Sequence, residues 1–225
     1  YLKLAENPEI KWIISNTTEA GIVFDGNDKY EDRPQSTFPG KLTRLLHERY
    51  KLFNGSKDSG FIILPCELID YNGEILKETV IKYADVWKLG SEFKEWLTEA
   101  NTWCSTLVDR IVTGYPFSEK DELEKELGYK DNFITTGEYF YLFVIQGPKW
   151  LEKELKLDKV NMNIKIVDDI KPYKLRKVGI LNGAHTLMVP VAYLYGLDTV
   201  KESIEDPVIG KYVKEAVFNE IIQVG

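Results

Sequence analysis

The sequence of 225 residues contains neither of the two common glycine-rich phosphate-binding motifs, and it has only two cysteines and two histidines. Without G-x-G-x-x-G or G-x-x-x-x-G-K-[ST], it holds no loop of the kind that cradles nucleotide phosphates. Cys66 and Cys104 are too few for a disulfide framework, so we expect reduced thiols. Two histidines and two separated cysteines cannot assemble a three-ligand catalytic zinc site, which predicts chemistry without a bound metal.

An excess of basic residues and a long apolar run are also missing. The net charge of −7 and the pI of about 5.1 disfavour nucleic acid as a partner. No apolar run approaches the ~20 residues that cross a bilayer, and the residues from Tyr1 onward lack the basic head and apolar core of a secretory signal. The composition therefore predicts a cytoplasmic protein without nucleic-acid or membrane partners, and it leaves the oligomeric state open.

Short apolar segments alternate with segments of helical periodicity in the first part of the chain. Residues 11–15 and 61–64 are continuous apolar runs, as expected for strands covered on both faces. Helical spacing follows each of them, from Pro39 to a stop at Asn54-Gly55 and again over residues 73–87. Alternation of strand and helix is typical of a parallel α/β sheet.

The pattern changes after about residue 91. It predicts two helices and then two strands, at residues 91–103, 118–127, 140–145 and 164–167. From Pro172 onward it predicts mainly helix, kinked or broken at Pro190 and stopped at Gly196. The predicted fold is α/β, the C-terminal half of a Rossmann-type parallel sheet followed by the start of a mostly α-helical substrate domain. We assign residues 1–113 to the partial nucleotide-binding domain and residues 114–225 to the partial helical domain.

The most informative motif is K-x-x-x-x-N-x-x-H, formed by Lys177, Asn182 and His185. A lysine, an amide and an imidazole can together protonate, hold and orient a carbonyl oxygen without a metal. On an α-helix, Asn182 and His185 share a face and Lys177 lies one to two turns away on an adjoining face. By spacing alone, a surface lysine on an ordinary amphipathic helix is the simpler interpretation.

The residues around this motif resemble the catalytic signature of the polyol-specific long-chain dehydrogenases, the mannitol dehydrogenase family. The signature starts at residues 168–173 (DDIKPY) and continues through His185. Three further blocks resemble members of this family that act on keto-hexuronates, namely residues 15–22 (SNTTEAGI), 65–73 (PCELIDYNG) and 104–116 (CSTLVDRIVTGYP). The resemblance covers essentially the whole chain. It implies an NAD-dependent oxidoreductase of a sugar acid in hexuronate catabolism, although the residues present do not distinguish NAD from NADP.

The resemblance implies roles for the three residues of the motif. Lys177 is the acid/base that gives a proton to the substrate oxygen in reduction and takes it in oxidation. Asn182 donates an amide N–H to the developing alkoxide, and His185 holds the substrate oxygen or the lysine in register. The structural alternative for Asn182 is that it caps a kink near Gly183. The alternative for His185 is a structural histidine with its hydrogen bonds made locally, which is the role that we assign to His47.

Asp109 and Arg110 lie in a V-D-R block that the resemblance assigns to substrate binding. A role in tying the two domains together is an equal alternative. Thr17, Thr18 and Glu19 follow the first predicted strand directly. Because ligands of open α/β sheets bind beyond the carboxyl ends of strands, we expect these three residues to bind the cofactor.

Cys66 and Glu67 end the second predicted strand, and for the same reason we expect them to line the cofactor pocket. Cys66 is interpreted as a packing residue, since no histidine lies near it in the sequence. The chain departs from the family pattern at Leu68, where an asparagine usually supplies a second oxyanion donor. Asn72 or a backbone amide has to substitute, or the enzyme works with one side-chain donor.

Several alternatives remain beside this interpretation. Tyr173 and Lys177 also spell the Y-x-x-x-K pair of short-chain dehydrogenases, but Asn182 and His185 have no place in that family. Fructuronate reductase and mannitol dehydrogenase are alternatives within the resembled family. Family members are about twice as long and begin with the dinucleotide fingerprint, so we expect the chain to be an internal fragment. A catalytically silent fragment is the alternative of another class.

Overall fold

The computed structural model describes residues 1–224, which divide into two compact units. Unit 1 comprises Tyr1–Asp168, and unit 2 begins at Asp169. This division lies well after residue 113, which we assigned as the end of the nucleotide-binding domain. Residues on both sides of position 113 belong to one sheet in unit 1, because a strand at Ser105–Asp109 pairs with a strand at Leu142–Gln146.

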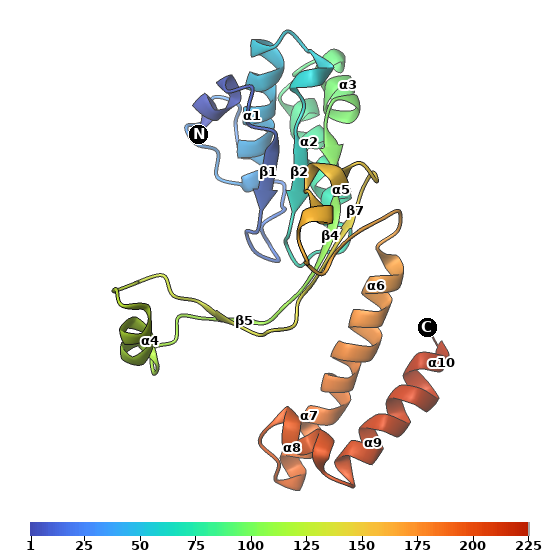
Figure 1. The fold of residues 1–225 in the computed structure, drawn as a ribbon. Coiled ribbons are helices and arrows are strands. Elements are labelled where there is room, and N and C mark those ends of the chain that lie inside the picture. The colour runs from blue at the N-terminus through green and yellow to red at the C-terminus, as the bar shows by residue number, and fades with distance from the viewer. Residues whose placement is uncertain (225) are drawn as a thin grey trace. The chain divides into compact units, whose positions relative to one another are not determined.

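A parallel sheet forms the first layer of unit 1. Its strands are β1 (Trp12–Ser15), β2 (Ile62–Pro65) and β3 (Thr102–Trp103), in the order β1-β2-β3. Around it lie the helices α1 (Phe38–Leu52), α2 (Asn72–Val86) and α3 (Ser91–Glu99) (Figure 1). The predicted parallel α/β arrangement is confirmed. Within the described residues, β1 pairs with β2 alone and is an edge strand.

The core of this layer is made by the apolar faces of the three helices. Ile63 from β2 is buried among them, and Leu46, Leu76, Val80, Phe93 and Leu97 are each fully enclosed. Burial of such a side chain contributes about 1.5–3 kcal/mol relative to exposure. The predicted helix over residues 91–103 was too long, because α3 ends at Glu99 and the chain turns at once into β3.

A second, mixed sheet continues unit 1. β4 (Ser105–Asp109) pairs antiparallel with β7 (Leu142–Gln146), and β7 pairs parallel with β8 (Ile164–Val167). The strands predicted at residues 140–145 and 164–167 are confirmed, whereas β4 was not predicted. The remaining short elements of the unit are η1 (Leu2–Glu6), η2 (Lys57–Ser59), α5 (Leu151–Glu154) and η3 (Leu157–Lys159).

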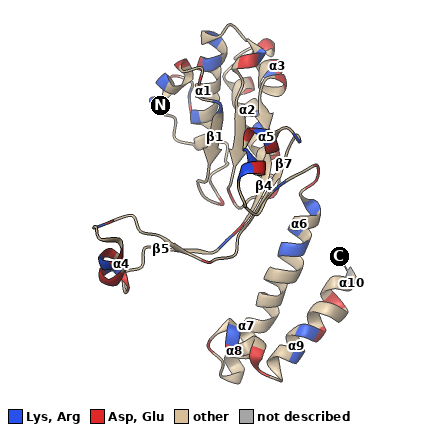
Figure 2. Cartoon of the chain, in the orientation of Figure 1, with Lys and Arg blue, Asp and Glu red and all other residues tan. Residues whose placement is uncertain are grey.

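An arm projects from the end of β4. It is a two-stranded ribbon of β5 (Val112–Gly114) and β6 (Thr136–Gly137), with α4 (Lys120–Leu127) between them (Figure 1). No side chain of α4 is buried, and most of its charged side chains are acidic (Figure 2). The arm therefore adds little to the core of the unit.

Unit 2 is helical, as predicted. A continuous run comprises α6 (Lys171–Leu175), the π-helix η4 (Arg176–Asn182) and α7 (Gly183–Tyr195). It is followed by α8 (Val200–Glu205), α9 (Ile209–Ala216), the π-helix η5 (Val217–Ile221) and α10 (Ile222–Val224). The core of the unit joins α7 to α9 and η5 through Met188, Ala192, Ile209, Val213 and Val217.

The end of α7 tests two predictions about helix breakers. The helix continues through Pro190, so the chain does not break there, and the alternative of a kink stays a prediction. A proline removes one N–H donor, and the remaining hydrogen bonds of the 13-residue helix carry the chain past it. Gly196 does end the helix, and its φ of 95° is in the left-handed region that favours glycine.

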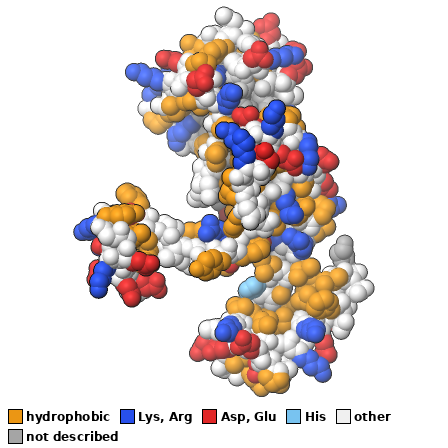
Figure 3. Space-filling model, viewed as in Figure 1, with side chains coloured by type: hydrophobic (Ala, Val, Ile, Leu, Met, Phe, Trp, Pro, Cys, Tyr) orange, Lys and Arg blue, Asp and Glu red, His pale blue; other side chains and the backbone are white. Residues whose placement is uncertain are grey.

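Apolar side chains cover much of the face of unit 2 that Figure 3 shows. On α7 the exposed ones are Val189, Val191, Tyr193, Leu194 and Tyr195. By length and composition alone, the helical run Lys171–Tyr195 could cross a membrane, although core helices of soluble proteins meet the same criteria. The sequence suggested no span because no continuous apolar run approaches the ~20 residues that cross a bilayer.

Candidate active site

The loops that follow β1 and β2 lie side by side at the carboxyl edge of the parallel sheet. Ser15 and Pro65, the last residues of the two strands, are register partners, and the Cys66 N–H donates to the Ser15 carbonyl over 2.7 Å. Thr17, Thr18 and Glu19 are exposed at this edge. The structure therefore brings together the two groups of residues that the sequence predicts for cofactor binding.

Glu67 connects these two loops. Its side chain is buried, with 2% exposed, and its carboxylate accepts hydrogen bonds from the Ser15 hydroxyl (3.1 Å), the Thr17 N–H (3.2 Å) and the Thr17 hydroxyl (2.9 Å). Such charge-assisted bonds are stronger than neutral ones. The burial favours a supporting role for Glu67, behind Thr17, over the direct cofactor contact expected from the sequence. Ser15 was not singled out in the sequence, where it is only a polar residue ending an apolar strand.

Asn72 does not replace the missing oxyanion donor. It is fully buried, and its amide donates to the carbonyls of Pro65 and Glu67, both over 3.0 Å. Its carbonyl oxygen accepts from the backbone N–H groups of Gly73 (2.9 Å) and Thr106 (2.8 Å). These bonds tie β2, α2 and β4 together, so the amide is not available to a ligand and the suggested substitution is wrong.

The thiols near this edge are poor nucleophiles. Burial raises the pKa of Cys66, and it raises the pKa of Cys104 to about 11. A thiol with a raised pKa contains little thiolate near neutral pH, and the thiolate is the reactive form. This supports the interpretation of Cys66 as a packing residue.

Asp109 and Arg110 lie where β4 passes into the arm. Asp109 is half-buried at the end of β4, opposite Leu142. Arg110 donates from Nε to the Glu138 carbonyl over 3.2 Å, and its guanidinium lies 5.7 Å from the centre of the Tyr141 ring. Arg110 thus holds the base of the arm, and its role in substrate binding stays a prediction.

Lys177 and Asn182 belong to the same π-helix, η4. In a π-helix each N–H bonds to the carbonyl five residues earlier, and the Gly183 N–H donates in this way to Val178, as well as to Ile180. Residues five apart, such as Lys177 and Asn182, therefore lie one above the other on one face. On the α-helix expected from the sequence they would be about 140° apart. The helix changes from π to α at Asn182, the position where a kink was considered.

His185 follows Asn182 on the first turn of α7. Its Nδ1 lies 2.7 Å from the Leu181 carbonyl oxygen, and since that oxygen carries no proton, Nδ1 donates. In the neutral ring, Nε2 then carries the lone pair and can accept a proton or a hydrogen bond. His185 and Asn182 are exposed and Lys177 is half-buried, so unit 2 presents a cationic group, an amide donor and an imidazole acceptor along one helical run.

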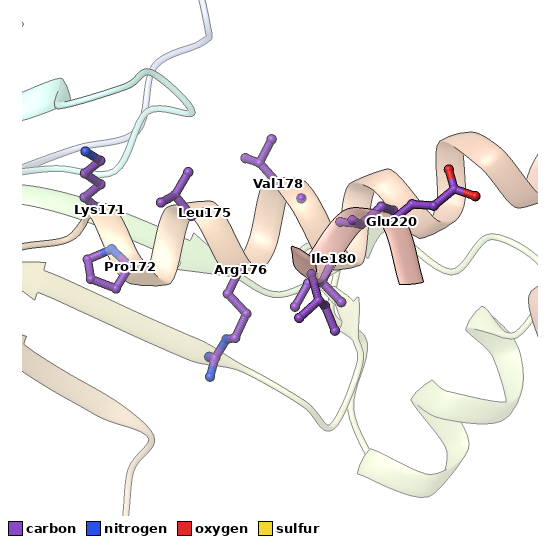
Figure 4. A pocket seen from close by; sticks show the side chains of 10 residues that line it. Lys171, Pro172, Leu175, Arg176, Val178, Ile180 and Glu220 are labelled. Carbon is purple, nitrogen blue, oxygen red and sulfur yellow. The ribbon is translucent and has the colours of Figure 1, made fainter. Parts of the chain in front are cut away.

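A cavity of about 850 Å³ lies beside the same helical run, between α6 and η4 on one side and η5 and α10 on the other (Figure 4). Its lining is mostly apolar, with Lys171, Arg176 and Glu220 as the charged residues. Lys177, Asn182 and His185 do not line it. Lys171 and Arg176 extend in different directions in Figure 4, so they do not form one site for a substrate carboxylate.

Two family models match the sequence. The mannitol dehydrogenase Rossmann domain matches residues 1–159, and the mannitol dehydrogenase C-terminal domain matches residues 169–224. The interval between these matches includes the point where the two structural units divide.

The sequence is also similar to named bacterial enzymes. Altronate oxidoreductases of Yersinia enterocolitica, Pectobacterium carotovorum and Escherichia coli are 60%, 59% and 60% identical to it over 224 residues. Each alignment covers 100% of this chain and 46% of the relative, so the chain spans about half the length of the curated relatives it matches.

Two solved structures share the fold. One is Pseudomonas fluorescens mannitol 2-dehydrogenase in a ternary complex with NAD and D-mannitol, with a TM-score of 0.71, 21% identity, and coverage of 99% of this chain and 46% of that chain. The other is a substrate-free D-sorbitol dehydrogenase, with a TM-score of 0.78, 22% identity, and coverage of 98% and 47%. At these identities the likeness concerns the fold alone, and it agrees with the predicted α/β class.

Proposed function

The chain belongs to the mannitol dehydrogenase family, and on that premise we propose that the whole protein is a cytoplasmic, NAD-dependent tagaturonate reductase (altronate oxidoreductase) of hexuronate catabolism. The substrate assignment is carried by the identity of about 60% with altronate oxidoreductases along 100% of this chain. The residues of unit 2 independently favour metal-independent reduction of a ketone.

Unit 1 fits one part of a dinucleotide site. Ligands of open α/β sheets bind beyond the carboxyl ends of the strands, and at that edge Thr17, Thr18 and Glu19 are exposed on a loop that Glu67 holds in place. We propose that this loop contacts the cofactor, with Cys66 packed behind it. When bound, NAD supplies or accepts the hydride.

Unit 2 supplies the groups that handle the proton. We propose that the Lys177 ammonium donates a proton to the carbonyl oxygen of tagaturonate as the carbonyl carbon is reduced, which yields the hydroxyl of altronate. In the oxidising direction, neutral Lys177 takes that hydroxyl proton. Asn182, on the same face of η4, donates an amide N–H to the oxygen while it carries negative charge. One such donor is worth about 2.7–4 kcal/mol in comparable sites.

His185 acts in this proposal as an acceptor. Because Nδ1 donates to the Leu181 carbonyl, the ring is held with Nε2 free of its own proton in the neutral form. Nε2 then accepts a hydrogen bond from a substrate hydroxyl or from the Lys177 ammonium. This role differs from that of Asn182, which donates.

Substitution of Lys177 tests the catalytic role. In the full-length enzyme, Lys177→Ala is expected to lower kcat by at least about 10²- to 10⁴-fold, with NADH binding nearly unchanged. Asn182→Ala is expected to cost about 10²- to 10³-fold. The ionisation seen in the pH profile of altronate oxidation should disappear in Lys177→Ala. A matched control is Lys211→Ala, which removes an exposed lysine of α9 in the same unit. Near wild-type turnover and an unchanged profile in Lys177→Ala would refute the mechanism and make Tyr173 the next acid to test.

Comparison of substrates tests the specificity. A uronate carries a carboxylate that a polyol lacks, so a site built for that carboxylate rejects the uncharged analogue strongly. We expect turnover of altronate and tagaturonate to exceed that of mannitol and fructose by orders of magnitude. Comparable turnover of both pairs would favour a mannitol dehydrogenase, and preference for fructuronate would favour fructuronate reductase. Arg110, Lys171 and Lys174 are the candidates for binding the carboxylate.

A further inference from the structure

We propose that Ile221 is a positioning residue for Lys177 and Asn182, because it packs against Gly179 and Gly183 and holds the helix between them in the π register. This inference rests on the proposed catalytic role of Lys177. Ile221 itself contacts no substrate in this proposal, and its effect on the reaction is transmitted through the backbone of η4.

The contact involves two glycines that lie four residues apart. A Cβ atom at Gly179 would lie 3.7 Å from Ile221 Cγ2, and a Cβ atom at Gly183 would lie 3.4 Å from Ile221 Cδ1. One isoleucine therefore lies within van der Waals reach of both positions, on η4 and at the start of α7. Among the described residues, and apart from the immediate chain neighbours, no other side chain comes within 4 Å of either Cβ position.

Ile221 reaches this position from a second π-helix. η5 covers Val217–Ile221, and its last bond runs from the Ile222 N–H to the Val217 carbonyl, five residues earlier. η4 and η5 are in contact with each other. Two π-helical segments thus pack together at the point where the glycines and the isoleucine meet.

A π-helical segment needs such support. π-Helices make up well under 1% of residues in proteins, and they occur most often as single turns at functional sites. The same residues could form an α-helix with bonds to the carbonyl four residues earlier. In that register Lys177 and Asn182 would be about 140° apart around the helix axis and would no longer share a face. The chain keeps the two side chains aligned only while the π register persists.

The first experiment replaces the isoleucine in the full-length enzyme. Ile221→Ala is expected to lower kcat for altronate oxidation by about 10- to 100-fold, since misplacing a reacting group by about 1 Å has effects of this size. NADH binding is expected to stay unchanged. The ionisation that Lys177→Ala removes should be displaced along the pH axis, which a loss of stability alone would not cause.

The matched control is Ile222→Ala. Ile222 is the next residue and lines the same cavity, but it does not lie within 4 Å of either glycine position. It is expected to leave kcat and the pH profile unchanged. Ile221→Val, which removes Cδ1 but keeps a Cγ2 atom for Gly179, is expected to lose less activity than Ile221→Ala.

A second variant changes the glycine side of the contact with Ile221. Gly183→Val places methyl groups where Ile221 Cδ1 packs, so it is expected to lower kcat and displace the same ionisation. Combining it with Ile221→Ala should cost no more than the worse single variant, because residues that act through one contact are not additive.

The outcomes separate this inference from the proposed function. If Lys177→Ala is inactive while Ile221→Ala or, where that variant does not fold, Gly183→Val keeps the wild-type kcat and pH profile, the role of Ile221 is refuted and the lysine mechanism stands. If Lys177→Ala is active, the lysine mechanism is refuted, and with it the basis of this inference.

Discussion

Replacement of Glu67 by glutamine is expected to weaken NADH binding by the full-length enzyme about tenfold. The carboxylate accepts three hydrogen bonds from Ser15 and Thr17 and holds the loop that we assign to the cofactor. A glutamine amide keeps one oxygen acceptor, but its nitrogen cannot accept the hydrogen bond that Ser15 or Thr17 donates to the second carboxylate oxygen. At least one bond to a charged acceptor is then lost, and each such bond contributes about 1.5–3 kcal/mol. In the variant, NADH has to order this loop when it binds. A cost of 1.4 kcal/mol in the free energy of binding corresponds to a tenfold higher Kd.

Fluorescence titration with NADH measures this effect directly. The expected result is a higher Kd with a kcat near the wild-type value at saturating cofactor, because Glu67 belongs to unit 1 and the proton-handling groups belong to unit 2. Glu78→Gln is the matched control, since Glu78 lies exposed on α2 and its replacement removes the same charge. An unchanged Kd in a folded Glu67→Gln variant would show that the loop after β1 does not depend on Glu67 or does not contact the cofactor.

Two further predictions concern ionisable groups away from the proposed chemistry. Burial acts to raise the pKa of Asp28, but hydrogen bonds from Ser36 and Thr37 outweigh it and hold the pKa well below its usual range. A depressed pKa adds stability above the unfolded value of about 3.9. Asp28→Asn should therefore lower the free energy of unfolding by about 1.5–3 kcal/mol at pH 7. In denaturant titrations this difference should shrink as the pH falls below about 4, and a constant difference would contradict the assignment. Burial raises the pKa of Cys66, and it raises the pKa of Cys104 to about 11. Iodoacetamide at pH 8 should therefore modify neither thiol rapidly in the native protein and both after unfolding, as peptide mass spectrometry can show. Rapid modification of Cys104 in the native protein would mean that this thiol is not buried.

The sequence predicts those parts of the fold that depend on neighbouring residues. The strands near residues 11–15 and 61–64 contain the apolar runs WII and FIIL. The helices after them have an apolar face of the usual period, so each element can be recognised locally. β4 could not be recognised in this way. Its first residues are Ser105 and Thr106, and what fixes them is Asn72, which lies 34 residues away from Thr106.

The candidate site was also predictable only where it depends on neighbouring residues. The K-x-x-x-x-N-x-x-H spacing and the carboxyl ends of β1 and β2 are visible in the sequence, and the catalytic and binding roles assigned to them remain predictions. The partnership of Ser15 with Glu67 spans 52 residues, and no local pattern signals it. The π register of η4 was also not predicted, because the choice between α and π depends on packing by Ile221, which is remote in the sequence from Lys177.

The edge position of β1 has a consequence for handling the chain in the laboratory. A strand with one neighbour leaves a row of backbone N–H and C=O groups on its other side, where a strand of another molecule can pair. Ile14 is 65% exposed on this strand, and a hollow of about 350 Å³ beside it is lined by apolar residues, among them Trp12 and Phe38. A polypeptide of these 225 residues produced alone should therefore self-associate as its concentration rises, and a charged substitution such as Ile14→Lys should keep it dispersed in light-scattering measurements.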